Sequence, residues 1–518
     1  MTHATRNLQR DIDWNLLFWK GLFLLFLFRI LYLAFFPYGL AGDETYYWDW
    51  GRHLDWGYFS KPPLIGWLMA LAAWVGGNST FGIRIFALLL GTGTLIFLFF
   101  LGRRMYDSRT AFWGVAAMAA CPGNAALNLL LTIDAPLLFF WSASLYLFWR
   151  LLTAEKRRGA WGVALIFSLG LGALSKQMTL VFFACGIFFL VVSPQYRCLL
   201  RKPWIWLGSV AALLFLAPPI YWNVKNNWIT FHHTAHHFQP SVPLPINLLK
   251  NLLDFLGTQL LLMSPVTWIL LMGLILYSLF AFSRMGSKER FLFSFSGPPL
   301  IFLLLLTFRQ KINGNWPAAF YPSGVLLLGA WATGTFDHLS RFKGWRKAFI
   351  PGILIGAALA VLTYSAPLVT KTAGLEGSRM DPLIRLEGWE SFAQKVAAVR
   401  TRLPRPQETF LMTIGHRYLT SELAFYLPGK PHVYRWVESG KIQSQYELWP
   451  GPTNKKGWDC LIVIKGKPAK VPSRLSKKFQ RLRRLKTVTR DFNAGRSRAY
   501  TLFLGMGWKE EPSSEAFR

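Results

Sequence analysis

Four carboxylates, an arginine and a lysine lie within one short stretch of this chain, residues 43–63, which reads DETYYWDWGRHLDWGYFSKPP. Asp43 and Glu44 come soon after the first strongly apolar segment. A carboxylate beside a membrane can accept a proton from a hydroxyl group or orient it. Lys61, near the end of the stretch, can bind a phosphate as a compact point charge. This combination suits a reaction with a lipid-linked phosphate as leaving group. The alternative is a solvated loop whose tryptophans lie at the membrane interface.

A second acidic residue, Asp134, stands alone in the apolar sequence LLLTIDAPLLFFW. A carboxylate at membrane depth is costly and therefore points to function, although Asp134 could simply cap a helix. Lys176, between two short apolar segments, could bind a phosphate or could extend to the interface to keep its ammonium in water. Arg84, near the start of another apolar segment, could contact the donor phosphate or pair with the acidic stretch.

Four histidines occur in the run FHHTAHHF. A spacing of four residues would bring two pairs onto one helix face, which is adequate for a divalent metal. No Asp or Glu lies beside them, so contact with a phosphate or sugar, or simple hydrogen bonding at an interface, are alternatives. The run contains His232, His233, His236 and His237.

Aromatic and amide side chains near these charged groups are candidates for lining a substrate cavity. A ring combined with amides suits stacking on a sugar and recognition of its hydroxyls, although Asn315 and Trp316 could also form a helix-entry turn before Pro317. The candidates are Tyr46, Trp222, Asn223, His232, His233, Asn315 and Trp316.

The elements that must position these residues are membrane helices. The chain has 518 residues, 53% of them hydrophobic. The apolar residues form blocks of about 20, the length that crosses hydrocarbon. We expect a polytopic α-helical membrane protein with about 11 to 13 crossings and a retained first span. The spans expected first are 14–36, 81–101, 110–129, 134–152, 161–175, 178–192, 204–222, 262–282, 291–308, 317–336 and 348–369.

The distribution of charge predicts the orientation. The net charge is +32, but much of the excess lies in short loops between apolar segments, where positive charge marks the cytoplasmic side. This pattern argues for membrane lipids and against nucleic acid as the partner. The stretch 37–63 is then an external loop, on the same side as the other polar segments. The basic loops are 103–109, 150–158, 197–202, 284–290 and 341–347, and the external segments are 132–134, 175–177, 223–244, 309–316 and 370–518.

The chain changes character after residue 369. Apolar blocks shrink to strand length in TFLMTI, CLIVI and YTLFLG, while RYLTSELAFYL has helical spacing. We therefore expect a transmembrane domain at 1–369 and a small external α/β domain at 370–518. The tail has 28 Lys and Arg against 13 Asp and Glu, a balance that would attract anionic lipid or glycolipid head groups. A solvated basic surface is the alternative. The four cysteines are scattered and predict neither disulfides nor a zinc cluster.

An ordered series of segments carries a family resemblance. GDETYYWDWGRHL, SKPPLIGWLMAL, FGIRIFALLLG, LTIDAPLLFFW, GLGALSKQMTL, YWNVKNNWITF and NGNWPAAFYP resemble the polyprenyl-phosphate-sugar-dependent GT-C glycosyltransferases of the protein-O-mannosyltransferase-like superfamily (glycosyltransferase family 39 type). The lipid A aminoarabinose transferases belong to this group. The likeness covers most of 37–322. The tail segments DPLIRLEGW, SELAFYLPG and SQYELW resemble the distal part of bacterial members.

The resemblance implies an inverting transfer of a sugar from undecaprenyl phosphate or a relative, on the periplasmic face of the bacterial inner membrane. It makes Asp43 the catalytic carboxylate, with Glu44 assisting acceptor or loop placement and Asp134 as the second acidic residue. Lys61 becomes a ligand of the donor phosphate, and the family-like context of Lys176 favours the same role. The basic external domain favours an anionic envelope glycolipid such as lipid A, or another glycan, as the acceptor.

One departure from the family concerns metal and sugar. The residue before Lys61 is Ser60, where the aminoarabinose transferases carry a glutamate linked to a metal. The resemblance therefore implies neither a metal nor aminoarabinose as the sugar, and a divalent metal stays open.

Three other classes of function compete with the transferase. A transporter or flippase of lipid-linked sugars tends to keep ionisable residues near the bilayer midplane in paired repeats, whereas here they gather at one outer edge. A transferase that glycosylates protein stays open, as does a scaffold. The sequence has no glycine-rich phosphate loop and no nucleotide-binding fingerprint. That absence fits a donor activated through a lipid phosphate.

Overall fold

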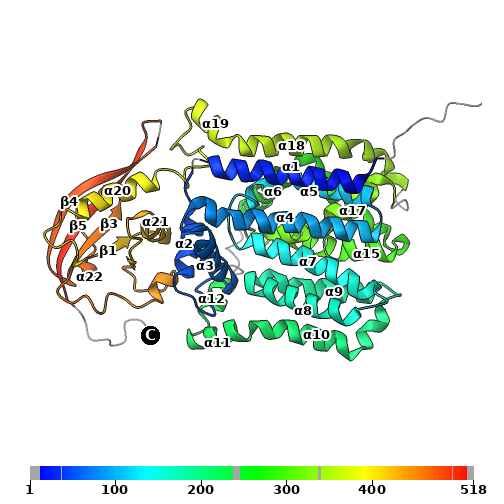
Figure 1. Cartoon of the computed structure of the whole chain (residues 1–518), viewed down its shortest axis with the longest axis horizontal. Coiled ribbons are helices and arrows are strands. Elements are labelled where there is room, and N and C mark those ends of the chain that lie inside the picture. Colours follow the sequence, from blue (N-terminus) through cyan, green and yellow to red (C-terminus); the bar gives the residue numbers. More distant parts are fainter. Residues whose placement is uncertain (1–11, 37, 237–244, 336–339, 493, 510–518) are drawn as a thin grey trace, which may run out of the picture.

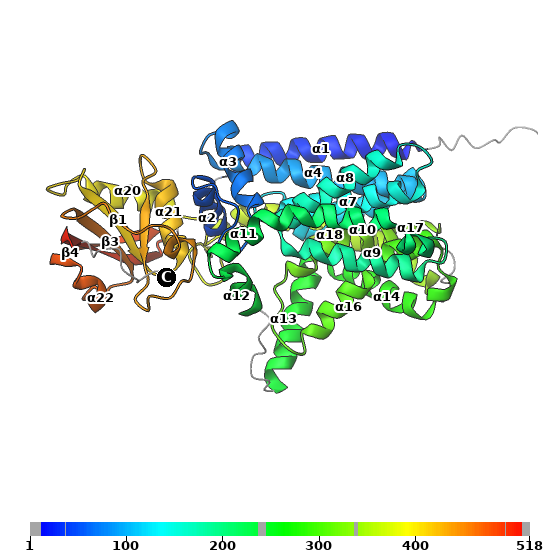
Figure 2. The ribbon, with the colours of Figure 1, turned by 90° about the horizontal axis from the view of Figure 1, so that it is seen from below.

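The computed structural model describes residues 12–36, 38–236, 245–335, 340–492 and 494–509. A bundle of helices forms one end of the molecule and a sheet with its own helices forms the other (Figure 1). Helices α2 (Gly42–Gly51) and α3 (Leu64–Gly76) lie between the two parts in both views (Figure 2). This arrangement puts the acidic stretch of the sequence at the junction of bundle and sheet.

Seven helical segments of the described chain are long and apolar enough to cross a membrane, or eight if a pair bent by 111° counts as one span. This number is smaller than the expected 11 to 13. The long segments are α1 (Trp14–Phe35), α4 (Thr80–Met105), α7 (Asp134–Thr153), α8 (Arg158–Ser175), Pro203–Lys225, Ser287–Leu306 and Phe342–Tyr364, and the bent pair is Leu248–Met263 with Pro265–Phe280.

The difference arises where expected spans fold as shorter pieces. The segment 110–129 divides into α5 (Ser108–Ala119) and α6 (Pro122–Leu127), because Pro122 cannot donate a helical hydrogen bond and starts a new helix. The segment 317–336 becomes η5 (Trp316–Phe320) followed by α17 (Tyr321–Thr333). Helix α9 (Val181–Val192) is apolar but short.

The remaining elements of the described chain complete the two parts. They are η1 (Gln177–Leu180), η2 (Arg197–Arg201), α10 (Pro203–Leu213), η3 (Leu214–Leu216), α11 (Ala217–Lys225), α12 (Ile229–His236), α13 (Pro245–Met263), α14 (Pro265–Phe280), η4 (Phe282–Arg284), α15 (Ser287–Ser294), α16 (Gly297–Leu306), η6 (Ser340–Ala348), α18 (Phe349–Tyr364), α19 (Ala366–Thr372), η7 (Gln445–Glu447) and α22 (Ser473–Ser476).

The first half of the stretch 37–63 is a buried helix, not the external loop that the sequence predicts. Helix α2 begins where Glu44 Oε2 accepts a hydrogen bond from the Ala41 amide at 2.9 Å, which satisfies one of the unpaired donors of the first turn. Its rings at Tyr46, Trp48 and Trp50 are all buried. Burial of these rings against α3 and the tail stabilises a helix that is too short to form alone. The first helix, expected at 14–36, is α1 and ends at Phe35, and Pro37 lies outside the described residues.

The tail folds into a five-stranded mixed sheet of order β2-β1-β3-β5-β4. Strand β1 pairs in parallel with β2 and β3, whereas β5 pairs antiparallel with β3 and β4. The three strands and the helix expected from TFLMTI, CLIVI, YTLFLG and RYLTSELAFYL are confirmed as β1, β3, β5 and α21. The bounds are β1 (Thr409–Ile414), β2 (Val433–Trp436), β3 (Asp459–Lys465), β4 (Phe479–Asp491), β5 (Ser497–Trp508), α20 (Trp389–Arg400) and α21 (Arg417–Tyr426).

One hydrophobic cluster joins the tail to the membrane part. It contains Trp48 of α2 and Met69 of α3 together with Leu423 of α21 and Leu461 of β3. Because buried side chains of both parts share this core, α21 is held firmly against α2. The N-terminal end of α21 is thereby fixed beside Asp43.

Candidate active site

Glu44 and Arg84 form a buried ion pair that anchors the start of α2. Arg84 donates from Nε to Glu44 Oε1 at 3.2 Å and from Nη2 to Oε2 at 2.9 Å, and the two side chains are 1% and 0% exposed. Arg84 also donates to the backbone carbonyls of Tyr38 and Gly39, while Glu44 accepts from the Leu131 amide. All these groups are occupied within the protein. The geometry favours the role of Arg84 as an ion-pair partner of the acidic stretch and gives no support to its contact with a donor phosphate. Glu44 is a positioning group in this arrangement.

The Asp43 side chain contacts α21. Its Oδ1 accepts a hydrogen bond from the Tyr418 hydroxyl at 2.9 Å and lies 3.5 Å from Arg417 Nη2. The Asp43 side chain is 42% exposed. Burial raises the pKa of Tyr418 to about 12, and the Asp43 charge adds to this effect. Tyr418 therefore stays protonated and donates to the carboxylate at neutral pH.

Asp134 joins two other residues that the sequence places on the same side. Its Oδ1 accepts from Lys176 Nζ at 2.8 Å, and its Oδ2 accepts from Asn315 Nδ2 at 2.7 Å. Asp134 opens α7, Lys176 follows α8 and Asn315 precedes η5. The shared side expected for these three segments agrees with this three-way contact. Asp134 and Lys176 are both buried, so the pair is strongly coupled.

Lys61 differs from Lys176 because its ammonium has no hydrogen bond or ion pair with any described residue. Burial lowers the pKa of Lys61 from 10.5 to about 8, and the nearby positive charge of Lys176 lowers it further. The charges of Asp134 and Asp43 act in the opposite direction. A half-buried cation without a partner is a ready ligand for an anion.

Lys61 and Lys176 are among the residues that line a cavity of about 570 Å³ in the membrane part. The polar groups at this cavity are few, and among them are His233, Asn313 and the indole of Trp316. The rest of the wall is mainly apolar and comes from η1, α9, α16 and η5, including Met178, Val181, Ala184, Cys185, Phe188, Pro298, Pro299, Phe302, Leu303, Leu306 and Phe320. A mainly apolar cavity whose wall includes two lysines matches a lipid chain with an anionic head group.

Several residues expected in the cavity have other contacts. The Tyr46 hydroxyl accepts from the Gln445 amide at 2.6 Å, and Trp222 Nε1 donates to Asp55 at 2.6 Å. Asn223 stays within its own segment, where it bonds Pro219 and Thr230. Of the expected cavity residues, His233 and Trp316 line the cavity, and Asn315 reaches Asp134 instead. His232 is exposed on α12 and is not among the lining residues.

The histidine run provides no metal site in the described part of the chain. No group of three or more His, Cys, Asp or Glu residues is placed to hold a metal among the described residues. The ring of His233 packs against Phe59, with centroids 4.7 Å apart. His237 and the side chain of His236 lie outside the description.

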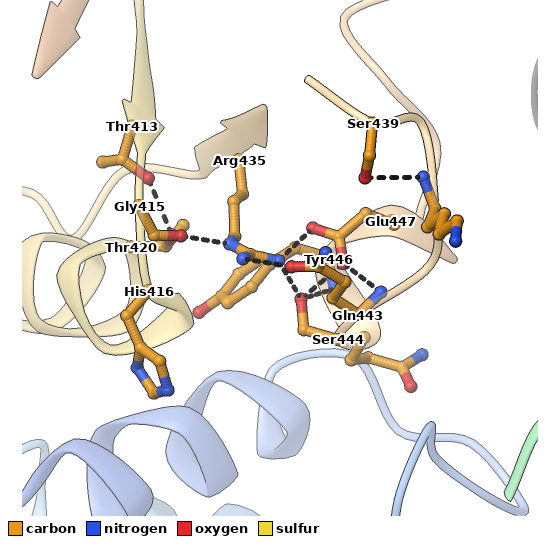
Figure 3. A network of polar contacts seen from close by, with 12 residues as sticks. Thr413, Gly415, His416, Thr420, Arg435, Ser439, Gln443, Ser444, Tyr446 and Glu447 are labelled. Carbon is orange, nitrogen blue, oxygen red and sulfur yellow. Dashed lines mark hydrogen bonds and ion pairs between the residues drawn. The ribbon is translucent and has the colours of Figure 1, made fainter. Parts of the chain in front are cut away.

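A polar network in the tail orders the segments that meet α2 (Figure 3). Arg435 forms a buried ion pair with Glu447 at 2.7 Å and donates to the Gly415 carbonyl at 2.9 Å, two residues before α21. Residues 445 and 446, which follow Arg435 in the chain, contact α2 and the loop between α2 and α3. Gln445 accepts from the Phe59 amide, and the Tyr446 hydroxyl donates to Asp49. The residues of the tail that reach Asp43 and α2 carry no local signal in the sequence beyond the family-like segments SELAFYLPG and SQYELW.

The chain is similar in sequence to known proteins. Residues 60–222 match the model of the dolichyl-phosphate-mannose-protein mannosyltransferase family. Lipid A galacturonosyltransferase RgtD of Rhizobium johnstonii is 29% identical over 429 residues, which cover 81% of this chain and 85% of that protein.

Solved structures share the fold. ArnT from Cupriavidus metallidurans in the apo state has a TM-score of 0.58 and 17% identity over 94% of this chain and 97% of its own. Its undecaprenyl phosphate-bound form has the same score. The Archaeoglobus fulgidus oligosaccharyltransferase has a TM-score of 0.50 at 14% identity, over 80% of this chain and 62% of its own. The chain therefore shares the fold of ArnT and is similar in sequence, over most of its length, to a lipid A galacturonosyltransferase.

Proposed function

We propose that the protein transfers a sugar from a polyprenyl-phosphate donor to an anionic envelope glycolipid, with lipid A as the first candidate. The observation that carries the proposal is Lys61, a cation that has no partner among the described residues and lines a mainly apolar cavity. The polyprenyl chain would occupy the groove between α9 and α16, and its phosphate would lie against Lys61, with Lys176 nearby. An ArnT structure bound to undecaprenyl phosphate supports this choice of carrier.

The proposed step is a displacement at the anomeric carbon of the sugar. An acceptor oxygen forms the new bond to this carbon, and the bond to the phosphate oxygen breaks, so that polyprenyl phosphate leaves with the electron pair. Lys61 stabilises the charge that grows on the leaving phosphate. If the acceptor group is a hydroxyl, Asp43 accepts its proton. If it is an ionised phosphate, no base is needed, and Asp43 stabilises positive charge on the sugar.

The distribution of charged loops supports a periplasmic site. Asp43, Lys61 and Asp134 lie at the end of the bundle that meets the sheet, whereas α4 and α7 lead to their basic last turns at the opposite end (Figure 1). Positive charge marks the cytoplasmic side. On this basis the site and residues 370–518 face the periplasm of the inner membrane.

The basic tail favours an anionic glycolipid as the acceptor. Strand β4 presents four exposed cations at the edge of the sheet, Arg481, Arg483, Arg484 and Lys486. RgtD, the curated relative, is named for action on lipid A. Both observations support lipid A or a similar glycolipid over a protein acceptor.

The test is a transfer assay with the full chain in lipid vesicles. Vesicles contain an extract of polyprenyl-phosphate sugars and lipid A, and mass spectrometry identifies the lipid products. The wild type should form a new glycolipid that Asp43→Asn does not form. Asp107→Asn is the matched control, because Asp107 caps α5 at the basic end and an asparagine keeps that cap. Movement of lipid-linked sugar across the bilayer in both proteins without any new product would instead identify a transporter.

A further inference from the structure

Arg417 lies beside Asp43 with most of its hydrogen-bond donors unused. Its Nη2 is 3.5 Å from both Asp43 Oδ1 and the Tyr418 hydroxyl, at the outer limit of hydrogen bonding. Nε is buried without a partner, and Nη1 donates to no described residue. The contrast with Arg84 is direct, because Arg84 makes two short contacts with Glu44 and two with carbonyls. Unlike Arg84, Arg417 therefore has donors available to bind a ligand.

The surroundings hold the Arg417 guanidinium in place. Its Cζ lies 5.1 Å from the ring centroid of Tyr46 and 4.9 Å from that of Tyr418. The Arg435–Glu447 pair fixes the Gly415 carbonyl just before α21. A side chain that is held by rings and keeps free donors has already lost much of the entropy that binding would cost.

Arg417 contacts Asp43 but does not line the cavity. It is not among the residues that line the 570 Å³ cavity, whereas Lys61 and Lys176 are. Its charge is close enough to contribute to the lowered pKa of Lys61, which burial mainly causes. Its side chain is 31% exposed, so a ligand can reach it. Asp43 thus contacts a cation of the tail, and its charge also acts on Lys61 at the cavity.

We propose that Arg417 binds a second anionic group of the substrates, a carboxylate or a phosphate, next to the reacting carbon of the sugar. This inference rests on the proposed function, in which the donor phosphate occupies Lys61. The planar guanidinium matches the paired oxygens of either anion. Binding would replace the weak contact with Asp43 and leave that carboxylate free for the acceptor or the sugar. The anion has two sources, a carboxylate on the transferred sugar or a phosphate on the acceptor.

The test measures equilibrium binding of four lipids to the full chain in nanodiscs. The donors are polyprenyl phosphate bearing a hexuronic acid or a neutral hexose, and the acceptors are lipid A with and without its phosphates. In one pair, Arg417→Gln should weaken binding of the lipid that carries the additional anionic group by about 10- to 100-fold. Binding of the other lipid of that pair should not change. Arg417→Lys should restore part of the loss. The pair that responds identifies the source of the anion.

Controls separate this inference from folding and from the proposed function. Arg104→Gln removes an exposed arginine at the opposite end of α4 and should leave all four affinities unchanged. Thermal unfolding of Arg417→Gln reports its folding. Equal weakening of both members of each pair, no weakening at all, or equal binding of charged and neutral lipids by the wild type would overturn the role of Arg417. Failure of Lys61→Gln to weaken both donors would instead argue against the proposed donor site.

Discussion

The unpartnered Lys61 predicts a pH dependence of donor binding that belongs to this one side chain. The pKa of Lys61 in the free protein is about 8, well below its ordinary value of 10.5. The charged form is therefore about 90% populated at pH 7 and about 10% populated at pH 9. If the donor phosphate needs the charged ammonium, the KM for the donor is lowest below pH 8 and rises about tenfold between pH 7 and pH 9.

The same pKa makes a prediction about stability. Because the folded pKa lies below the unfolded one, the penalty for the buried charge is fully present below pH 8 and disappears as the pH rises to about 10.5. A difference of about 2.5 pH units corresponds to at most about 3 kcal/mol. Lys61→Met should therefore raise the thermal stability of the donor-free protein at pH 7. Added polyprenyl phosphate should stabilise the wild type and not this variant.

Lys61→Arg is the decisive control, because arginine stays charged throughout this range. The assay follows initial rates against donor concentration between pH 6.5 and 9.5 for the wild type, Lys61→Arg and Lys61→Gln. Lys61→Gln should raise the KM at pH 7 by about 10- to 100-fold. An equal rise of KM with pH in the wild type and Lys61→Arg would refute the reasoning, since the titrating group would then lie elsewhere.

Three further predictions concern the carboxylates and their partners. Asp43→Asn should lower kcat by about 100- to 10,000-fold with little change in melting temperature. Glu44→Gln should lower both kcat and the melting temperature, because Glu44 is buried in an ion pair and Asp43 is not. Equal melting temperatures for the two variants in detergent would contradict this difference. Asp134→Ala should destabilise the protein by about 3 kcal/mol by leaving Lys176 buried and unpaired, and addition of Lys176→Met should recover most of the loss in thermal unfolding. Tyr418→Phe should lower kcat by about tenfold by removing the hydrogen bond to Asp43, and an unchanged kcat would exclude Tyr418 from the site.

The strands show what local sequence can and cannot predict. Strands β1 and β3 are buried along most of their length and read as short apolar runs. Strand β4 escaped prediction because QRLRRLKTVTR looks like a charged, solvated segment. It is a strand because it lies at the edge of the sheet and pairs with β5 alone, so that most of its cations face solvent, although Arg490 near its end is buried.

Contacts in the site between residues far apart in the chain are also difficult to predict from the sequence. Topology alone put Asp134, Lys176 and Asn315 on one side, and their contact agrees with that hypothesis. Tyr418 and Arg417 could not be found in this way, because they are about 375 residues from Asp43 in the chain. Helix α2 was expected as a loop for a related reason. Its aromatic residues suit an interfacial loop, and they form a helix only because α3 and α21 bury them.

Exposure separates the charges that hold this fold from those available to a ligand. Glu44 and Arg84 are adjacent to the reacting region but are closed off from it by mutual contacts, while Asp43 and Arg417 remain accessible with contacts at 2.9 to 3.5 Å. The accessible arginine comes from the tail, and so does Tyr418. The tail is therefore part of the site that we propose, and its docking on α2 must be intact for transfer. A change at that interface, such as loss of the Tyr446 contact with Asp49, should lower activity without touching any residue that meets substrate.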